Sequence, residues 1–124
     1  MDGARRAVLA GGLAALAGCG RDRGGRFVDP LEAAVASPDR PPAERARDAW
    51  RHPLETLRFF GLQPGRTVVE FWPGAGYVTA ILAPMLAATQ GRLVAAQVDP
   101  AAAPANAQLV ARYRQRFADA RRYG

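Results

Sequence analysis

Residues 68–77 have the sequence VVEFWPGAGY, and this segment decides how the chain folds. Residues 67–71 are β-branched, aromatic and almost all apolar, which predicts a strand that is covered on both faces. The glycines that follow let the main chain approach a ligand, and a helix after them turns free N–H groups toward the same point. The pattern favours a nucleotide-cofactor site at the rim of a parallel sheet, where Glu70 orients polar ligand groups. The alternative is a tight strand-to-helix turn without a ligand.

The residues after this loop predict a second strand parallel to the first. A stripe of apolar residues indicates a helix from about Tyr77 to Thr89, with a kink at Pro84. Residues 93–98, LVAAQV, then form a strand, which completes a strand, crossover helix and strand. A final helix over about 106–122 exposes its arginines. We expect its buried side to consist of Leu109, Val110, Tyr113 and Phe117.

The segment before the first strand predicts short helices over residues 43–51 and 53–60, separated by His52-Pro53. Trp50, Leu54, Leu57 and Phe60 recur at helical spacing, so we expect them on one buried face. His52 is the only histidine of the chain. Two interpretations of it stay open, a base or pocket lid on the one hand and a structural or exposed residue on the other.

The first 18 residues have the layout of an export signal. A charged start with Arg5-Arg6 precedes an apolar stretch over residues 7–17, which is too short for a spanning helix. The two arginines also match part of the twin-arginine export signal, and the alternative is the ordinary positive start of any export signal.

Residues 16–19, LAGC, resemble the lipobox of bacterial lipoproteins. The resemblance implies cleavage before Cys19, lipid attached to the Cys19 thiol, and residues 19–26 as a tether. The implied location is the cell envelope, on the periplasmic face of a bacterial membrane. The alternatives are a coincidental cysteine after the signal or a short buried apolar helix.

The net charge is +6, and all 17 basic residues are arginine. Such an excess favours anionic surfaces. The arginines are spread along the chain without interleaved aromatic residues, so we do not expect nucleic-acid binding. One cysteine and one histidine do not make a typical zinc site, and we expect no metal.

Two segments resemble the first two motifs of class I S-adenosylmethionine-dependent methyltransferases: residues 68–77, VVEFWPGAGY, and residues 91–100, GRLVAAQVDP. Residues 47–84 are similar to a group of exported methyltransferase-like proteins, and a weaker match extends to about Gly124. The resemblance implies that Glu70, Gly74 and Gly76 surround the methionine part of S-adenosylmethionine and that Tyr77 begins the helix beside it.

The chain also departs from the family pattern at two places. Trp72, followed by Pro73, stands at the position of the first loop glycine, which makes the loop bulkier and stiffer. Gln97 occupies the position of the acid that holds the ribose hydroxyls, and Asp99 follows two residues later. Residues two apart on a strand share a face, so both are candidates for the ribose contact. The alternative for Asp99 is the start of an Asp-Pro turn.

The resemblance implies an α/β, Rossmann-like parallel sheet, of which residues 27–124 hold the N-terminal helices and only the first βαβ unit. Two covered strands do not make a stable sheet, so we expect missing C-terminal strands or a partner chain to complete it. The expected function is exported S-adenosylmethionine-dependent methyl transfer to an unknown acceptor, with the catalytic residues unassigned. The alternative is a non-catalytic, lipid-anchored binding or scaffolding protein that keeps the fold.

Overall fold

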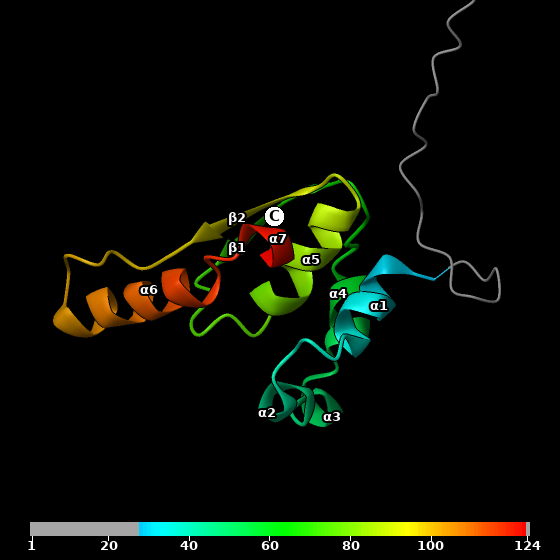
Figure 1. Cartoon of the computed structure of the whole chain (residues 1–124), viewed down its shortest axis with the longest axis horizontal. Coiled ribbons are helices and arrows are strands. Elements are labelled where there is room, and N and C mark those ends of the chain that lie inside the picture. Colours follow the sequence, from blue (N-terminus) through cyan, green and yellow to red (C-terminus); the bar gives the residue numbers. More distant parts are fainter. Residues whose placement is uncertain (1–27, 124) are drawn as a thin grey trace, which may run out of the picture.

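Helix α5 (Thr79–Ala88) lies at the centre of the computed structural model, which describes residues 28–123 (Figure 1). Its sequence, TAILAPMLAA, is apolar on every side and continues through Pro84, and seven of its ten residues are buried. A helix of this kind needs neighbours all round. Helix α1, strand β2 and helix α7 pack against it.

Two strands flank α5 in the sequence and pair in parallel. Strand β1 (Thr67–Phe71) and strand β2 (Arg92–Ala96) are in register from Thr67 opposite Arg92 to Phe71 opposite Ala96. The predicted first strand is confirmed. The second strand begins one residue earlier than predicted and ends at Ala96, so Gln97 and Val98 follow it as irregular chain.

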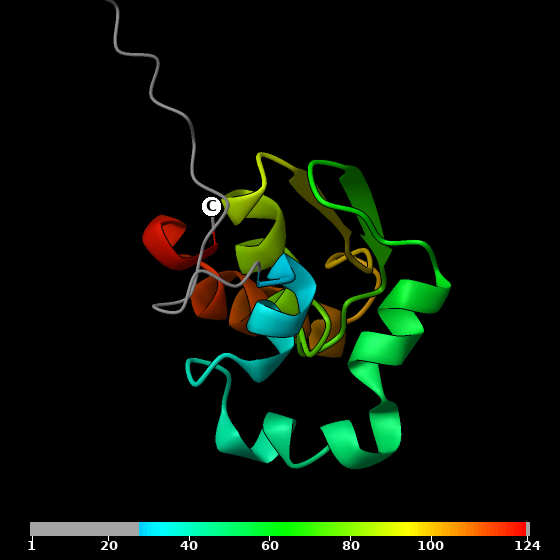
Figure 2. The same cartoon turned by 90° about the vertical axis from the view of Figure 1, so that its right-hand side faces the viewer.

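The predicted Rossmann-like parallel sheet is wrong for the described residues. Residues 28–123 form a small helix-rich domain with only these two strands, which amount to part of a sheet at the periphery of the domain (Figure 2). The expected cover on both faces is also wrong, because Val69 is 64% and Phe71 81% exposed. Helix α5 shields the inward side, and the side that carries Val69 and Phe71 is open.

Four short helices precede the sheet: α1 (Pro30–Ala36), α2 (Pro42–Arg45), α3 (Asp48–Arg51) and α4 (Pro53–Phe59). Asp29 caps α1, because its Oδ1 accepts a hydrogen bond of 2.8 Å from the Leu31 N–H. Helix α1 adds Leu31 and Ala34 to the core around α5. Helix α4 packs on α1, and Arg58 of α4 forms ion pairs with Asp29 and Glu32.

The buried stripe predicted for Trp50, Leu54, Leu57 and Phe60, which belong to α3 and to α4 with its C-cap, is half wrong. Leu54 and Leu57 pack against the core, but Trp50 is 70% and Phe60 75% exposed. For Trp50 the reason is His52, which adopts a left-handed conformation with φ 44° and ψ 55° between α3 and α4. The two helices therefore do not continue one another, and helical spacing does not carry across the break.

The C-terminal segment forms two helices where one was predicted, α6 (Pro104–Arg116) and α7 (Ala120–Tyr123). Val110 and Tyr113 are buried as expected, whereas Leu109 and Phe117 are only half-buried. Arg116 was expected in solvent, but its guanidinium forms an ion pair with Glu44 of α2 at 2.7 Å.

The predicted export signal, Cys19 and the tether lie outside the described residues. Within residues 28–123, no helix has the length and apolar character that crossing a membrane requires.

The close approach of Phe117 to the loop after β1 predicts a strong effect of a methyl group at Gly76. A Cβ there would lie 2.3 Å from Cε2 of Phe117, whose ring is held between Tyr113 and Tyr123, and the φ of Gly76 is +87°. We expect Gly76→Ala to lower the free energy of unfolding by ~2–4 kcal/mol, from overpacking and left-handed strain together.

Gly74→Ala is the matched control for this substitution. Gly74 also has a positive φ, +59°, but a Cβ there would meet no atom within 4 Å. In the control, the free energy of unfolding should fall only by the strain of an alanine in the left-handed conformation, ~1–2 kcal/mol. Urea unfolding of the two variants measures both values, and equal losses would contradict the packing of Phe117 on Gly76.

Candidate functional site

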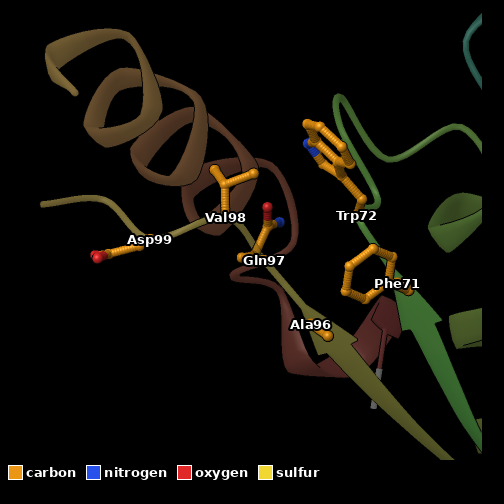
Figure 3. A pocket seen from close by; sticks show the side chains of 6 residues that line it. All are labelled: Phe71, Trp72, Ala96, Gln97, Val98 and Asp99. Carbon is orange, nitrogen blue, oxygen red and sulfur yellow. The ribbon is translucent and has the colours of Figure 1, made fainter. Parts of the chain in front are cut away.

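An open cleft of about 220 Å³ lies where the two strands end (Figure 3). Because the strands are parallel, their carboxyl ends meet at one edge of the sheet. The cleft is lined by Phe71, Trp72, Ala96, Gln97, Val98 and Asp99. The structure therefore brings two of the predicted site residues, Gln97 and Asp99, together with two aromatic side chains.

Trp72 is held in an unusual backbone conformation at this cleft. Its φ is +57°, in the left-handed region that bulky residues rarely adopt, at a cost of ~1–3 kcal/mol. Its N–H donates a hydrogen bond of 2.9 Å to the carbonyl of Ala96, which keeps Trp72 beside the end of β2. The exposed indole stands edge-on to the ring of Phe71, with 6.5 Å between the centroids. The two rings form an aromatic wall of the cleft.

The side-chain amide of Gln97 is buried without a hydrogen-bond partner. Neither its Nε2 nor its Oε1 finds one among the described residues. Figure 3 shows this side chain beyond the end of β2, with its amide directed toward the space between Val98 and Trp72, whereas the Asp99 side chain points away. An unpaired buried polar group costs ~1–3 kcal/mol, and this amide has unused capacity both to donate and to accept hydrogen bonds.

Asp99 combines a turn with its place at the rim of the cleft. Its Oδ1 accepts a hydrogen bond of 2.8 Å from the Ala101 N–H, and its carbonyl accepts one of 3.0 Å from the Asn106 side chain. These bonds are those of the predicted Asp-Pro turn. Asp99 is exposed and belongs to the residues that line the cleft, but its carboxylate points away from it.

Glu70 does not line the cleft. Successive strand residues face opposite sides, so Glu70 points inward while Phe71 points outward. Glu70 Oε2 accepts a hydrogen bond of 2.6 Å from the Thr79 hydroxyl, whose oxygen accepts one of 3.1 Å from the Tyr113 hydroxyl. Burial raises the pKa of the Glu70 carboxyl, and the Thr79 bond opposes this rise. The carboxyl thus joins β1 to α5 and α6.

The three remaining predicted site residues, Gly74, Gly76 and Tyr77, follow Trp72 in the loop and do not line the cleft either. Gly76 faces the ring of Phe117, so its lack of a side chain serves packing. Gly74 is open on the side where a Cβ would project, which leaves room for a ligand. The Tyr77 side chain is buried, and its hydroxyl donates to Asp48 of α3.

His52 lies away from this cleft. His52 is exposed at the junction of α3 and α4 and is not among the lining residues. Across residues 28–123, no three side chains of the metal-ligating types gather closely enough to hold an ion.

Sequence reasoning noted Trp72 only as a bulky departure from a glycine position and missed the aromatic wall. The signal was present, since Phe71 and Trp72 end an apolar strand just before the loop. The unpartnered state of the Gln97 amide has no sequence signal, because it depends on which groups the fold brings near it.

No family model, no curated protein and no solved structure matches this chain. The functional interpretation therefore depends on the chemistry of the site and on the sequence.

The buried Glu70 carboxyl predicts a pH dependence of stability. Its pKa in the folded protein lies above its ordinary value of 4.5, so the folded state binds this proton more tightly than the unfolded state. The stabilisation is fully present below pH 4.5 and is lost as the pH rises through the raised pKa. Glu70→Gln does not ionise, so its stability relative to the wild type should increase as the pH rises above 4.5.

Urea unfolding at several pH values measures this difference. Glu55→Gln, at an exposed carboxylate of α4, is the control for the removal of a carboxylate as such. A difference for Glu70→Gln that does not change with pH would mean that the carboxyl is not buried as described.

Proposed function

We propose that this protein binds S-adenosylmethionine in the cleft at the strand ends and transfers its methyl group to an acceptor. The observation that carries the proposal is the buried Gln97 amide, which has no partner among the described residues and lies beside the wall formed by Phe71 and Trp72. An amide pairs with hydroxyls or with the edge of a base, and aromatic rings take the flat face of a base. These are the groups of a nucleoside.

The residues of the cleft fit the nucleoside end of S-adenosylmethionine. The volume of about 220 Å³ lies below the ~300 Å³ at which complete ligand pockets begin, so the cleft suits one part of the cofactor. Phe71 and Trp72 would hold the adenine, and Gln97 would bond the ribose hydroxyls. The open space beside Gly74 leaves room for the methionine part of the cofactor. When bound, the cofactor supplies an electrophilic methyl group on its sulfonium.

The protein's own contribution to such a reaction is positioning. Binding the nucleoside at a fixed edge of the sheet orients the methyl group, and orientation lowers the barrier because it removes the entropy of bringing the reactants together. The acceptor and the catalytic residues are left unassigned by the cleft.

We place the protein at the cell envelope, on the periplasmic face of a bacterial membrane, anchored through lipid on Cys19. This part of the proposal rests on the sequence of residues 1–26 alone. Further strands or a partner chain would cover the open sheet face, because parallel strands are ordinarily buried on both sides. The exposed Val69 and Phe71 are the observation in favour of such a cover.

The second candidate function is a lipid-anchored protein that binds a small molecule without catalysis. Asp99 is the one ionisable side chain among the lining residues, and it points away from the cleft. Among the described residues, the cleft thus offers groups for binding and no positioned base. Saturable binding of S-adenosylmethionine with no methyl transfer to any acceptor tested would favour this candidate.

Titration calorimetry of the full chain with S-adenosylmethionine tests the binding step that both candidates share. We expect saturable heat for the wild type and at least about tenfold weaker binding for Gln97→Leu, a loss of ~1.4 kcal/mol or more. The same variant removes an unpaired buried amide, so it should raise the free energy of unfolding of the ligand-free protein. Opposite effects on binding and stability separate a lost contact from a damaged fold.

Phe59→Ala is the matched control, because Phe59 is an exposed aromatic residue of α4 that does not line the cleft. Its binding should equal that of the wild type. Absence of saturable heat at millimolar S-adenosylmethionine would overturn the proposed function.

A further inference from the structure

Three arginine side chains surround the ring of Tyr77, away from the cleft. The guanidinium carbons of Arg40, Arg47 and Arg51 lie 5.3, 5.3 and 4.8 Å from the ring centroid. Arg47 and Arg51 belong to α3 and its N-cap, and Arg40 precedes α2. Cations are attracted to an aromatic face, so the buried Tyr77 ring holds these side chains together.

Only Arg40 is neutralised by a carboxylate. Asp48 Oδ2 accepts a hydrogen bond of 2.8 Å from Arg40 Nη1, and Asp48 Oδ1 accepts one of 2.9 Å from Nη2. The Tyr77 hydroxyl also donates to Oδ1, so both oxygens of Asp48 are occupied. The hydrogen bonds from Arg40 hold the pKa of Asp48 below its usual range, which keeps the carboxylate charged.

Arg47 and Arg51 have no paired carboxylate among the described residues. Among residues 28–123, neither guanidinium has an acidic oxygen within 4.0 Å. The two residues are four apart in the chain and contact the same ring, so their like charges repel. In the same cluster, the buried Nε of Arg40 has no acceptor among the described residues. Donors and positive charge therefore exceed acceptors around Tyr77.

The cluster is fixed to the loop that follows β1. Tyr77 ends this loop, and its hydroxyl is bonded to Asp48 of α3. Arg116 of α6 donates a hydrogen bond of 2.7 Å to the carbonyl of Ala75 and pairs with Glu44 of α2. The lobe formed by α2 and α3, which lies opposite the sheet in Figure 1, is thus held at two points.

We propose that Arg47 and Arg51, held on the Tyr77 ring, bind an oxyanion, the carboxylate or phosphate group of a small ligand. An oxyanion supplies the acceptors and the negative charge that this cluster lacks, and planar guanidinium groups bind carboxylate and phosphate well. None of these three residues lines the cleft. If a separate anionic ligand supplies the group, the site goes beyond the proposed function; if the amino-acid end of S-adenosylmethionine supplies it, the site extends that function and rests on it.

Calorimetric titration of the full chain with inorganic phosphate, at constant ionic strength, tests the site. We expect saturable binding in the millimolar range for the wild type and at least about tenfold weaker binding when Arg47→Gln and Arg51→Gln are combined. The control combines Arg112→Gln and Arg114→Gln, two exposed arginines of α6, and removes the same charge. The control should bind phosphate like the wild type.

Loss of folding does not obscure this test, because the single variant Arg51→Gln changes an exposed side chain and should also weaken phosphate binding. Circular dichroism confirms that each variant is folded. Equal phosphate affinity in both double variants, or no saturable binding to the wild type, would overturn the proposal.

Two nucleosides distinguish the sources of the anion. S-adenosylhomocysteine carries the amino-acid carboxylate and 5′-methylthioadenosine lacks it. If the site binds that carboxylate, the Arg47 and Arg51 variants lower the affinity for S-adenosylhomocysteine but not for 5′-methylthioadenosine. Phosphate then competes with S-adenosylhomocysteine for binding. If a separate group binds, phosphate affinity is the same in protein saturated with S-adenosylhomocysteine. A chain that binds phosphate but neither nucleoside would refute the proposed function and leave the oxyanion site standing.

Discussion

The fold depends on the burial of α5, a helix that has no polar side to expose to solvent. The hydrophobic effect requires cover on all its sides, and each neighbour is placed by that need. The two strands that flank α5 in the sequence pair in parallel over one of its sides, and α1 and α7 cover others. Because one helix cannot shield both faces of a sheet, the outward face with Val69 and Phe71 stays open. The cleft arises at the end of this arrangement, where both strands stop together.

The sequence sufficed for features that depend on neighbours in the chain. The apolar run of β1, the buried stripe of α5 and the parallel pairing were predicted correctly, and the pairing alone places Gln97 and Asp99 at the edge where Phe71 ends. The sequence did not suffice to predict the fold class. A five-residue apolar strand has the same composition whether it is covered on two faces or one, and a two-stranded partial sheet gives the same local pattern as a complete one.

The bonding partners of Glu70 and Tyr77 show why candidate site residues are harder to predict than strands and helices. Both stand where a cofactor loop would place them in the sequence, yet each is bonded to a residue far away in the chain, Thr79 with Tyr113 for Glu70 and Asp48 for Tyr77. Such bonds follow from tertiary packing, which a single sequence does not encode locally. His52 is similar, since its left-handed conformation separates α3 from α4 and leaves Trp50 exposed.

Several unfavourable features of the molecule lie close to the loop that follows β1. Trp72 is in a strained conformation beside the unpartnered amide of Gln97, and Tyr77, five residues later, gathers more positive charge than Asp48 balances. Each feature lowers the stability of the ligand-free protein, and the buried core around α5 offsets the loss. A sequence under selection for stability alone would remove them by single substitutions, such as leucine for Gln97 or glutamine for Arg51. Their location next to Trp72 and Tyr77 is what the two proposed ligand sites predict, because binding sites often give up stability for function.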